Sequence, residues 1–213
     1  MRRGRFITFE GGEGGGKSTQ LKLLAERLRG LGLELVTTRE PGGSPGAEAV
    51  RDLLVQGAAD RWSPLTETLL MYAARRDHLE RVITPALERG AWVLCDRFAD
   101  STRAYQGAAG GAPAELIATL ERHVVADHWP DLTLVLDLPA ETGLERAAAR
   151  AGLETRFESK GAAFHARLRQ AFLDIARAEP DRCVVVDAAR PLEAVSQAVW
   201  DGVVARLEPP GHG

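Results

Sequence analysis

The chain has 213 residues, which suits one domain with a sizeable core, or a core that carries a mobile insertion. Hydrophobic residues make up 45% and charged residues 27% of the sequence, as in ordinary soluble proteins, and no apolar run approaches the roughly 18 residues of a membrane span. A formal net charge of -3 argues against a general nucleic-acid binder, although local basic clusters can still hold phosphates.

Short apolar runs alternate with longer helical patterns along the chain. The runs are continuously apolar, as expected for strands covered on both faces, and lie at residues 5–9, 33–38, 91–95, 132–138 and 182–187. The helices are expected near residues 17–31, 45–57, 66–89, 112–126, 140–150, 161–178 and 191–207. This order predicts a three-layer α/β domain with a parallel sheet over residues 1–208, followed by a short tail at 209–213.

The first run leads into FEGGEGGGKSTQ (residues 9–20), which contains the pattern Gly-x-x-x-x-Gly-Lys-Ser from Gly11 to Ser18. A strand precedes the pattern and a helix follows it, which is the setting that a phosphate-binding loop requires. Backbone N–H groups would then face phosphate oxygens, Lys17 would reach the β- and γ-phosphates, and the Ser18 hydroxyl would bind Mg²⁺.

The second run ends in TTREPGG (residues 37–43). Proline and glycine suit a simple turn, but Arg39 and Glu40 would lie at the same sheet edge as the glycine loop, where ligands of open parallel sheets bind. An arginine there suits the phosphate of a second, acceptor substrate.

The long helix at 66–89 contains LLMYAARRDH (residues 69–78). Leu69, Leu70 and Met71 suit a core, and Arg75 falls on the same helix face as Met71 because it lies four residues later.

The third run ends in Asp96, followed by Arg97. A helix cap would explain the aspartate, but it is also the expected partner of the metal. Arg97 could clamp phosphoryl oxygens with its planar guanidinium group.

DSTRAYQG (residues 100–107) follows, with Ser101, Thr102, Tyr105 and Gln106. This polar stretch suits recognition of a nucleobase and sugar, or equally a cap and turn.

Residues 147–161 are polar and carry Arg150, Arg156 and Lys160. They fit either a solvated helix end or a mobile lid that brings arginines over a bound nucleotide.

Cys95 and Cys183 both lie in apolar runs, which predicts two buried, reduced thiols rather than a disulfide or metal pair. The histidines show no metal-ligand spacing. The sequence from Met1 leads directly into a strand pattern without a signal-like segment, so we expect a cytoplasmic location.

Two features favour a kinase over a GTPase switch. The Asn-Lys-x-Asp guanine motif does not occur, and two arginine-bearing loops accompany the glycine loop, enough for an acceptor phosphate as well as a donor.

Together, FEGGEGGGKSTQ, TREPGG, the YAAR helix and DR followed by DSTRAYQG resemble thymidylate kinases in order and spacing, from Phe6 to about Leu207. The resemblance implies a P-loop NTPase fold with a five-stranded parallel sheet flanked by helices. It also implies phosphorylation of dTMP by ATP and Mg²⁺, and a homodimer.

The resemblance also implies residue roles. The ATP-binding set is Gly11, Gly12, Glu13, Gly14, Gly15, Gly16, Lys17, Ser18 and Thr19, and Ser18 and Asp96 serve Mg²⁺. Glu13 would approach the acceptor sugar, Tyr105 would disfavour a ribose 2′-OH, and Arg75 with Gln106 would address thymine. The acceptor site also takes in Arg39, Pro41, Arg97, Ser101 and Thr102. Catalytic roles fall to Lys17, Asp96, Arg97 and the lid arginines.

Two points stay open on the sequence. Many family members have a phenylalanine against thymine where this chain has Met71 followed by Tyr72, so either could contact the base. Either Arg150 or Arg156 could be the catalytic lid arginine.

Two alternatives remain. One is a kinase of the same fold for another nucleoside monophosphate or for a nucleoside. The other is a non-catalytic ATP-binding module, which the presence of Lys17, Ser18, Asp96 and Arg97 in one chain disfavours.

Overall fold

The computed structural model describes residues 3–58, 60–149, 157 and 160–210. Its centre is a sheet of five parallel strands in the order β2-β3-β1-β4-β5. The strands are β1 (Phe6–Glu10), β2 (Leu35–Arg39), β3 (Trp92–Asp96), β4 (Leu132–Asp137) and β5 (Cys183–Asp187). The five expected apolar runs are therefore all strands of one sheet.

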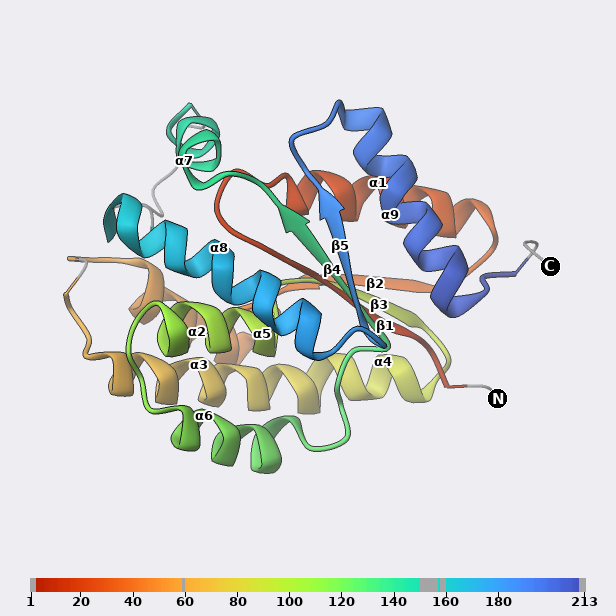
Figure 1. Cartoon of the computed structure of the whole chain (residues 1–213). Coiled ribbons are helices and arrows are strands. Elements are labelled where there is room, and N and C mark those ends of the chain that lie inside the picture. The colour runs from red at the N-terminus through yellow and green to blue at the C-terminus, as the bar shows by residue number, and fades with distance from the viewer. Residues whose placement is uncertain (1–2, 59, 150–156, 158–159, 211–213) are drawn as a thin grey trace.

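Helices connect and cover the strands (Figure 1). The α-helices are α1 (Lys17–Gly30), α2 (Pro45–Val55), α3 (Pro64–His78), α4 (Thr84–Glu88), α5 (Ala99–Thr102), α6 (Ala114–Leu120), α7 (Ala140–Ala148), α8 (Gly161–Ala178) and α9 (Leu192–Leu207). Three π-helical segments continue α3, α5 and α6, and they are η1 (Leu79–Ile83), η2 (Arg103–Ala108) and η3 (Glu121–Val125). The expected helix at 66–89 is thus α3, η1 and α4 in succession.

The helix formed by α5 and η2 was not expected from the sequence. Nearly every residue from Ala99 to Gln106 is buried, so no polar face alternates with an apolar one. Helical periodicity is visible in a sequence only when one face meets water. The stretch DSTRAYQG therefore forms a buried helix rather than a simple cap and turn.

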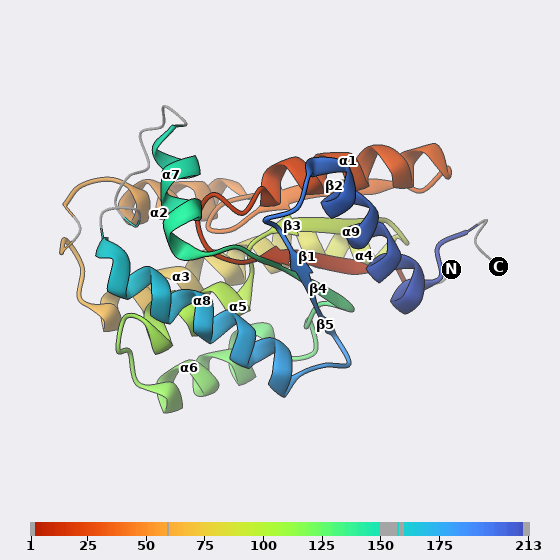
Figure 2. The same cartoon turned by 45° about the horizontal axis from the view of Figure 1, so that its top comes forward.

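The two faces of the sheet carry separate apolar clusters. Helices α1 and α9 cover one face, where Leu28, Trp200 and Val203 pack with strand residues. Helices α3, α4, α5 and α8 cover the other face, and α6 lies outside them (Figures 1 and 2). Burial of both faces explains why the strand sequences are continuously apolar.

Three strand ends meet at one level of the sheet. Asp96 of β3 is in register with Phe9 of β1 on one side and with Arg39 of β2 on the other. The loops after these strands therefore leave the sheet side by side, at the edge where open parallel sheets bind ligands. No helix in the described part of the chain combines the length and apolar character needed to cross a membrane.

Candidate active site

The glycine loop lies between β1 and α1, as the sequence pattern predicts. Gly14 has a φ of +69°, and a side chain there would collide with the backbone of Gly143 in α7. Glycine avoids both problems, so the loop can turn tightly beneath α7. The loop then delivers the chain into the N-terminus of α1, whose free N–H groups attract anions.

Lys17 is held inside this loop. Its Nζ donates to the carbonyl oxygens of Gly12 (2.7 Å) and Gly11 (3.2 Å), and the side chain is buried. Burial, followed by the nearby charge of Arg97, lowers the pKa of Lys17 to about 8. A bound polyphosphate would supply the negative charge that this ammonium group lacks.

Ser18 and Asp96 lie beside the loop. The Ser18 hydroxyl donates a hydrogen bond to Asp96 Oδ2, which joins the start of α1 to the end of β3. A hydroxyl and a carboxylate are oxygen ligands that suit Mg²⁺, which usually keeps water and phosphate oxygens as further ligands. Within the described residues no cluster of three or more histidine, cysteine or acidic side chains could hold a metal alone. A metal here would draw its other ligands from a bound phosphate.

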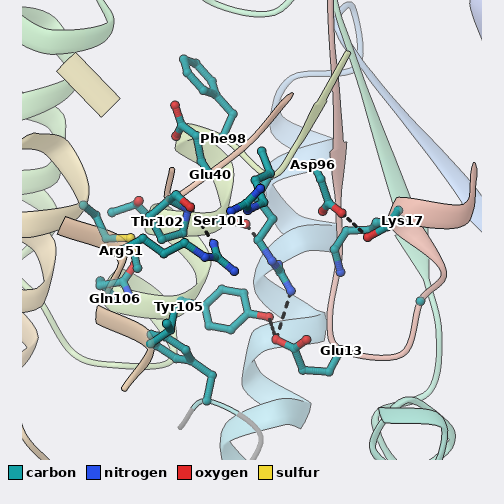
Figure 3. Close-up of a pocket in the computed structure, with 18 of the residues that line it drawn as sticks. Glu13, Lys17, Glu40, Arg51, Asp96, Phe98, Ser101, Thr102, Tyr105 and Gln106 are labelled. Atoms are coloured by element: carbon teal, nitrogen blue, oxygen red, sulfur yellow. Dashed lines mark hydrogen bonds and ion pairs between the residues drawn. The ribbon is translucent and has the colours of Figure 1, made fainter. Parts of the chain in front are cut away.

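Arg97 and Glu13 form an ion pair between the loop and the end of β3, and Figure 3 shows the labelled Glu13 next to Tyr105. Arg97 Nη2 donates to Glu13 Oε1 at 3.0 Å, and the Tyr105 hydroxyl donates to the same oxygen at 2.6 Å. Burial alone would raise the pKa of Glu13, but Arg97 and Lys17 outweigh burial and lower it to about 2. Glu13 is therefore a carboxylate throughout the ordinary pH range.

The backbone at Arg97 is held in an uncommon conformation. Its φ is +69°, a region that costs a non-glycine residue of order 1–3 kcal/mol and that persists where surrounding contacts enforce it. Glu10 makes such contacts, because its carboxylate accepts from Phe98 N (2.7 Å), Ser101 N (3.3 Å) and Ser101 Oγ (2.6 Å). Sequence reasoning missed Glu10, although a glutamate that ends an apolar strand is itself a signal.

Arg75 is deeply buried in a chain of polar contacts. Its Nε donates to Glu40 at 2.8 Å, and one terminal nitrogen, Nη2, donates to Phe98 O and to Thr102 Oγ1. Glu40 also contacts the Nδ1 of His78. The other terminal nitrogen of Arg75, Nη1, is buried and finds no partner among the described residues. A donor in this position is available to a ligand.

These groups line one cavity of about 380 Å³, within the usual range for small-molecule sites. Of the residues that the sequence singled out, those lining it are Glu13, Gly14, Gly15, Gly16, Lys17, Ser18, Arg39, Glu40, Pro41, Met71, Arg75, Asp96, Arg97, Ser101, Thr102, Tyr105 and Gln106. Arg39 is half exposed and pairs with Glu48 of α2. The loops after β1, β2 and β3 thus contribute to one site.

Other expected residues lie elsewhere. Tyr72 is buried in the apolar cluster beneath the site, where its hydroxyl donates to Glu121, whereas Met71 lines the cavity. Gly11 and Gly12 contribute the carbonyl groups that hold Lys17. The lid arginines Arg150 and Arg156 fall outside the described residues.

Thr19 borders a second cavity of about 480 Å³ beside the glycine loop. Its wall also includes residues that the sequence did not predict, among them Arg146 from α7 and the segment from Ala188 to Leu192 after β5. Both cavities include Gly15 and Gly16 in their walls. A ligand whose phosphates lie in the loop could extend into either one.

Sequence reasoning also missed Arg51 and Phe157 as cavity residues. Arg51 lies on α2 and donates to the carbonyl of Pro41 at 2.6 Å. Arg51 lies four residues after the buried Ala47 and four before Val55, another cavity residue. Residues at this spacing share one face of a helix, and this was the signal available in the sequence. Phe157 contacts Tyr105 edge to face, with ring centres 5.6 Å apart.

Comparison with known proteins gives a consistent result. A family model described as thymidylate kinase matches residues 9–199. The thymidylate kinase of Caulobacter vibrioides is 69% identical over 97% of this chain and 99% of its own length. That of Bradyrhizobium sp. strain ORS 278 is 56% identical over 96% and 92%. A crystal structure of thymidylate kinase from Ehrlichia chaffeensis superposes with a TM-score of 0.75 at 36% identity, covering 93% of this chain and 98% of that one.

Proposed function

The chain belongs to the thymidylate kinase family, and from this premise we propose that it phosphorylates dTMP to dTDP with ATP by direct in-line transfer. The observation that carries the proposal is the single cavity whose wall includes Lys17 and Ser18 of the glycine loop together with Arg39 and Arg75. Arg97, which also lines it, is paired with Glu13 of the loop. A kinase needs this juxtaposition of donor and acceptor sites.

The donor site is formed by the glycine loop. Its amide groups and Lys17 hold the ATP phosphates, which offsets the cost of burying the Lys17 ammonium group. Ser18 and Asp96 would hold Mg²⁺, which neutralises the charge that develops on the phosphate oxygens when it is bound. The second cavity, which Thr19 borders, accommodates the remainder of the nucleotide.

The acceptor site lies across the loop. Arg39 and Arg97 hold the dTMP phosphate, and Arg51 is placed to assist them. Glu13 lies near the sugar, and its pair with Arg97 keeps that guanidinium group oriented. Tyr105, held by its hydrogen bond to Glu13, fills the space that a ribose 2′-OH would need.

The base lies deeper in the cavity. Met71 supplies an apolar contact with an adaptable sulfur. Arg75 Nη1 is a buried donor available to a base oxygen, and Gln106 offers its amide. The polar groups that line this end suit a base with a carbonyl group.

In the transfer step a dTMP phosphate oxygen attacks the γ-phosphorus of ATP while the bond to the β-phosphate oxygen breaks, which gives dTDP and ADP. Lys17 and Arg97 spread the developing negative charge. We place the remaining positive charge on a lid at about residues 147–161, through Arg150 or Arg156. The loop has no arginine of its own, so this assignment supplies a charge that the reaction needs.

An ADP-release assay across dTMP, dUMP, dCMP, dGMP and thymidine tests the function. We expect the highest kcat/KM with dTMP and little turnover of thymidine, because Arg39 and Arg97 require a phosphate. Absence of turnover with dTMP would refute the proposal. A preference for another monophosphate would reassign the acceptor within the same fold.

We also propose that the enzyme is a homodimer and that it works in the cytoplasm. Both cysteines are free and buried, as suits a reducing compartment, and recovery of the activity outside the cytosolic fraction of the cell would contradict the second point.

A further inference from the structure

The amide of Gln106 is held from behind by a buried carboxylate. Gln106 lies on η2 and Glu67 on α3, and both side chains are almost fully buried. Gln106 Nε2 donates to Glu67 Oε1 at 2.7 Å. Lys160 Nζ lies 3.9 Å from the same oxygen and forms an ion pair with Glu67. The labelled Gln106 side chain lies at the cavity wall in Figure 3.

This contact decides which way the amide faces. In this hydrogen bond the NH₂ group of Gln106 donates and Glu67 Oε1 accepts, so the NH₂ group faces Glu67. The amide oxygen, Oε1, then faces the other way and makes no hydrogen bond to any residue that the structure describes. Gln106 therefore offers the cavity an acceptor, not a donor.

Arg75 offers the complementary group in the same cavity. Its Nη1 is a buried donor without a partner in the described residues, while Glu40 and Thr102 occupy its other nitrogens. The base end of the cavity thus has one available acceptor on Gln106 and one available donor on Arg75.

This pair distinguishes the pyrimidines. Thymine presents an N3–H donor beside a C4 carbonyl acceptor, whereas cytosine presents an N3 acceptor beside a C4 amino donor. An acceptor on Gln106 and a donor on Arg75 match thymine at both atoms and oppose cytosine at both. A free amide could rotate by about 180° about its last bond and lose half of this selection.

We propose that Glu67 is a positioning residue that sets the pyrimidine preference by holding the Gln106 amide oxygen toward the base. The inference rests on the proposed function, in which Arg75 and Gln106 meet the acceptor base. Glu67 itself touches no substrate. A purely structural Glu67 would affect stability and leave base preference unchanged, which makes the two roles separable.

Glu67→Gln tests the proposal with an isosteric change. The amide introduced in place of the carboxylate can donate as well as accept, so the Gln106 amide is no longer confined to one orientation. We expect kcat/KM for dTMP to fall about tenfold, chiefly through KM, and the ratio of kcat/KM for dTMP to that for dCMP to fall at least tenfold.

The matched control is Thr68→Val on the same helix, because Thr68 is buried and bonds only within α3, to the carbonyl of Pro64. Its ratio should equal that of the wild type.

The double change Glu67→Gln with Gln106→Glu is the rescue. It exchanges the two groups. The carboxylate now at position 106 offers the cavity an acceptor, as the amide oxygen of Gln106 does in the wild type, and the amide now at position 67 donates to that carboxylate from behind. We expect the dTMP to dCMP ratio to return to within about threefold of the wild type. This variant carries the test by itself if the single variant does not fold.

The possible outcomes distinguish a failure of the role proposed for Glu67 from a failure of the proposed kinase function. Wild-type turnover of dTMP with an unchanged ratio in folded Glu67→Gln would overturn the role of Glu67 and leave the proposed function standing. A double variant that folds and still lacks the preference would also overturn it. Equal turnover of dTMP and dCMP by the wild type would instead count against the proposed acceptor.

Discussion

Glu10 shows how one side chain links two parts of the site. It ends β1, and its carboxylate accepts three hydrogen bonds from Phe98 and Ser101, which follow Arg97 in the chain. Burial, followed by the nearby charge of Asp100, raises the pKa of Glu10 to about 7. The folded protein therefore binds a proton here more tightly than the unfolded chain does.

This shift predicts a pH dependence of stability. Between pH 4.5 and 7 the unfolded chain has lost the proton while the folded state keeps it, so the contribution of Glu10 to stability falls as pH rises. A shift of this size corresponds to about 3 kcal/mol. In the Glu10→Gln variant the side chain at position 10 cannot titrate. The difference between the two free energies of unfolding, wild type minus variant, should therefore decrease by about 3 kcal/mol as the pH rises from about 4.5 to 8. Urea denaturation at several pH values measures it.

Glu34→Gln is a suitable control, because Glu34 is exposed and pairs with Arg89 on the surface. Its pH profile should parallel that of the wild type. If the Glu10→Gln profile were also parallel to the wild type, Glu10 would not titrate as described.

At the scale of elements, the connection from β2 to α2 depends on close packing against α3. Gly43 has a φ of +88°, and a Cβ there would collide with His78 of α3 and with Thr38 of β2. His78 and Thr38 bond to each other at 2.7 Å, and His78 contacts Glu40, the partner of Arg75. The loop therefore supports the arginine that we assign to the base.

Gly43→Ala should disturb this support. We expect a loss of about 2–4 kcal/mol in the free energy of unfolding, from the left-handed backbone and the collision together, and a rise of about tenfold in KM for dTMP as Arg75 shifts. Gly32→Ala is the matched control, with a φ of +80° and open space around it. It should cost about 1–2 kcal/mol and leave KM unchanged. Equal effects of the two changes on KM would contradict the proposed support.

At the scale of the whole molecule, the strand order brings loops from distant parts of the sequence together at one edge of the sheet. Outside the apolar clusters on the two faces of the sheet, two leucines of α3 are half exposed. They are Leu65 and Leu69, which lie one helical turn apart. An apolar pair on one face of a helix next to the active site suits contact with a second copy. This is the surface through which we expect the homodimer to form.

The dimer prediction is tested by sedimentation equilibrium. The wild type should give twice the chain mass of 23.0 kDa, and the double change Leu65→Glu with Leu69→Glu should shift the equilibrium to the monomer, because buried carboxylates are costly. Val185→Glu on the edge strand β5 alters an equally exposed apolar residue and should leave the dimer intact. A monomeric wild type would contradict the prediction.

Much of the fold could be predicted from the sequence, because continuous apolar runs and helical periodicity are local signals. The helix formed by α5 and η2 could not, since burial on all sides removes the periodicity. The partners of buried polar groups were also beyond reach. Gln106 and Glu67 are 39 residues apart, and Ser101 and Glu10 are 91 residues apart, so only the packing of α3, α5 and η2 against the sheet brings them together.

By itself the sequence determined the glycine loop, the order of strands and helices along the chain, and the arginines that a phosphate site requires, because each depends on residue type and short spacing. Only the tertiary structure shows that Met71 lines the cavity while Tyr72 lies in the core. Neighbouring residues point about 100° apart on a helix, and the face that α3 turns toward the cavity is set by its packing, with Tyr72 held in the core by Glu121. It alone also revealed Glu67 behind Gln106, because a hydrogen bond between two buried side chains depends on their distance and direction in space.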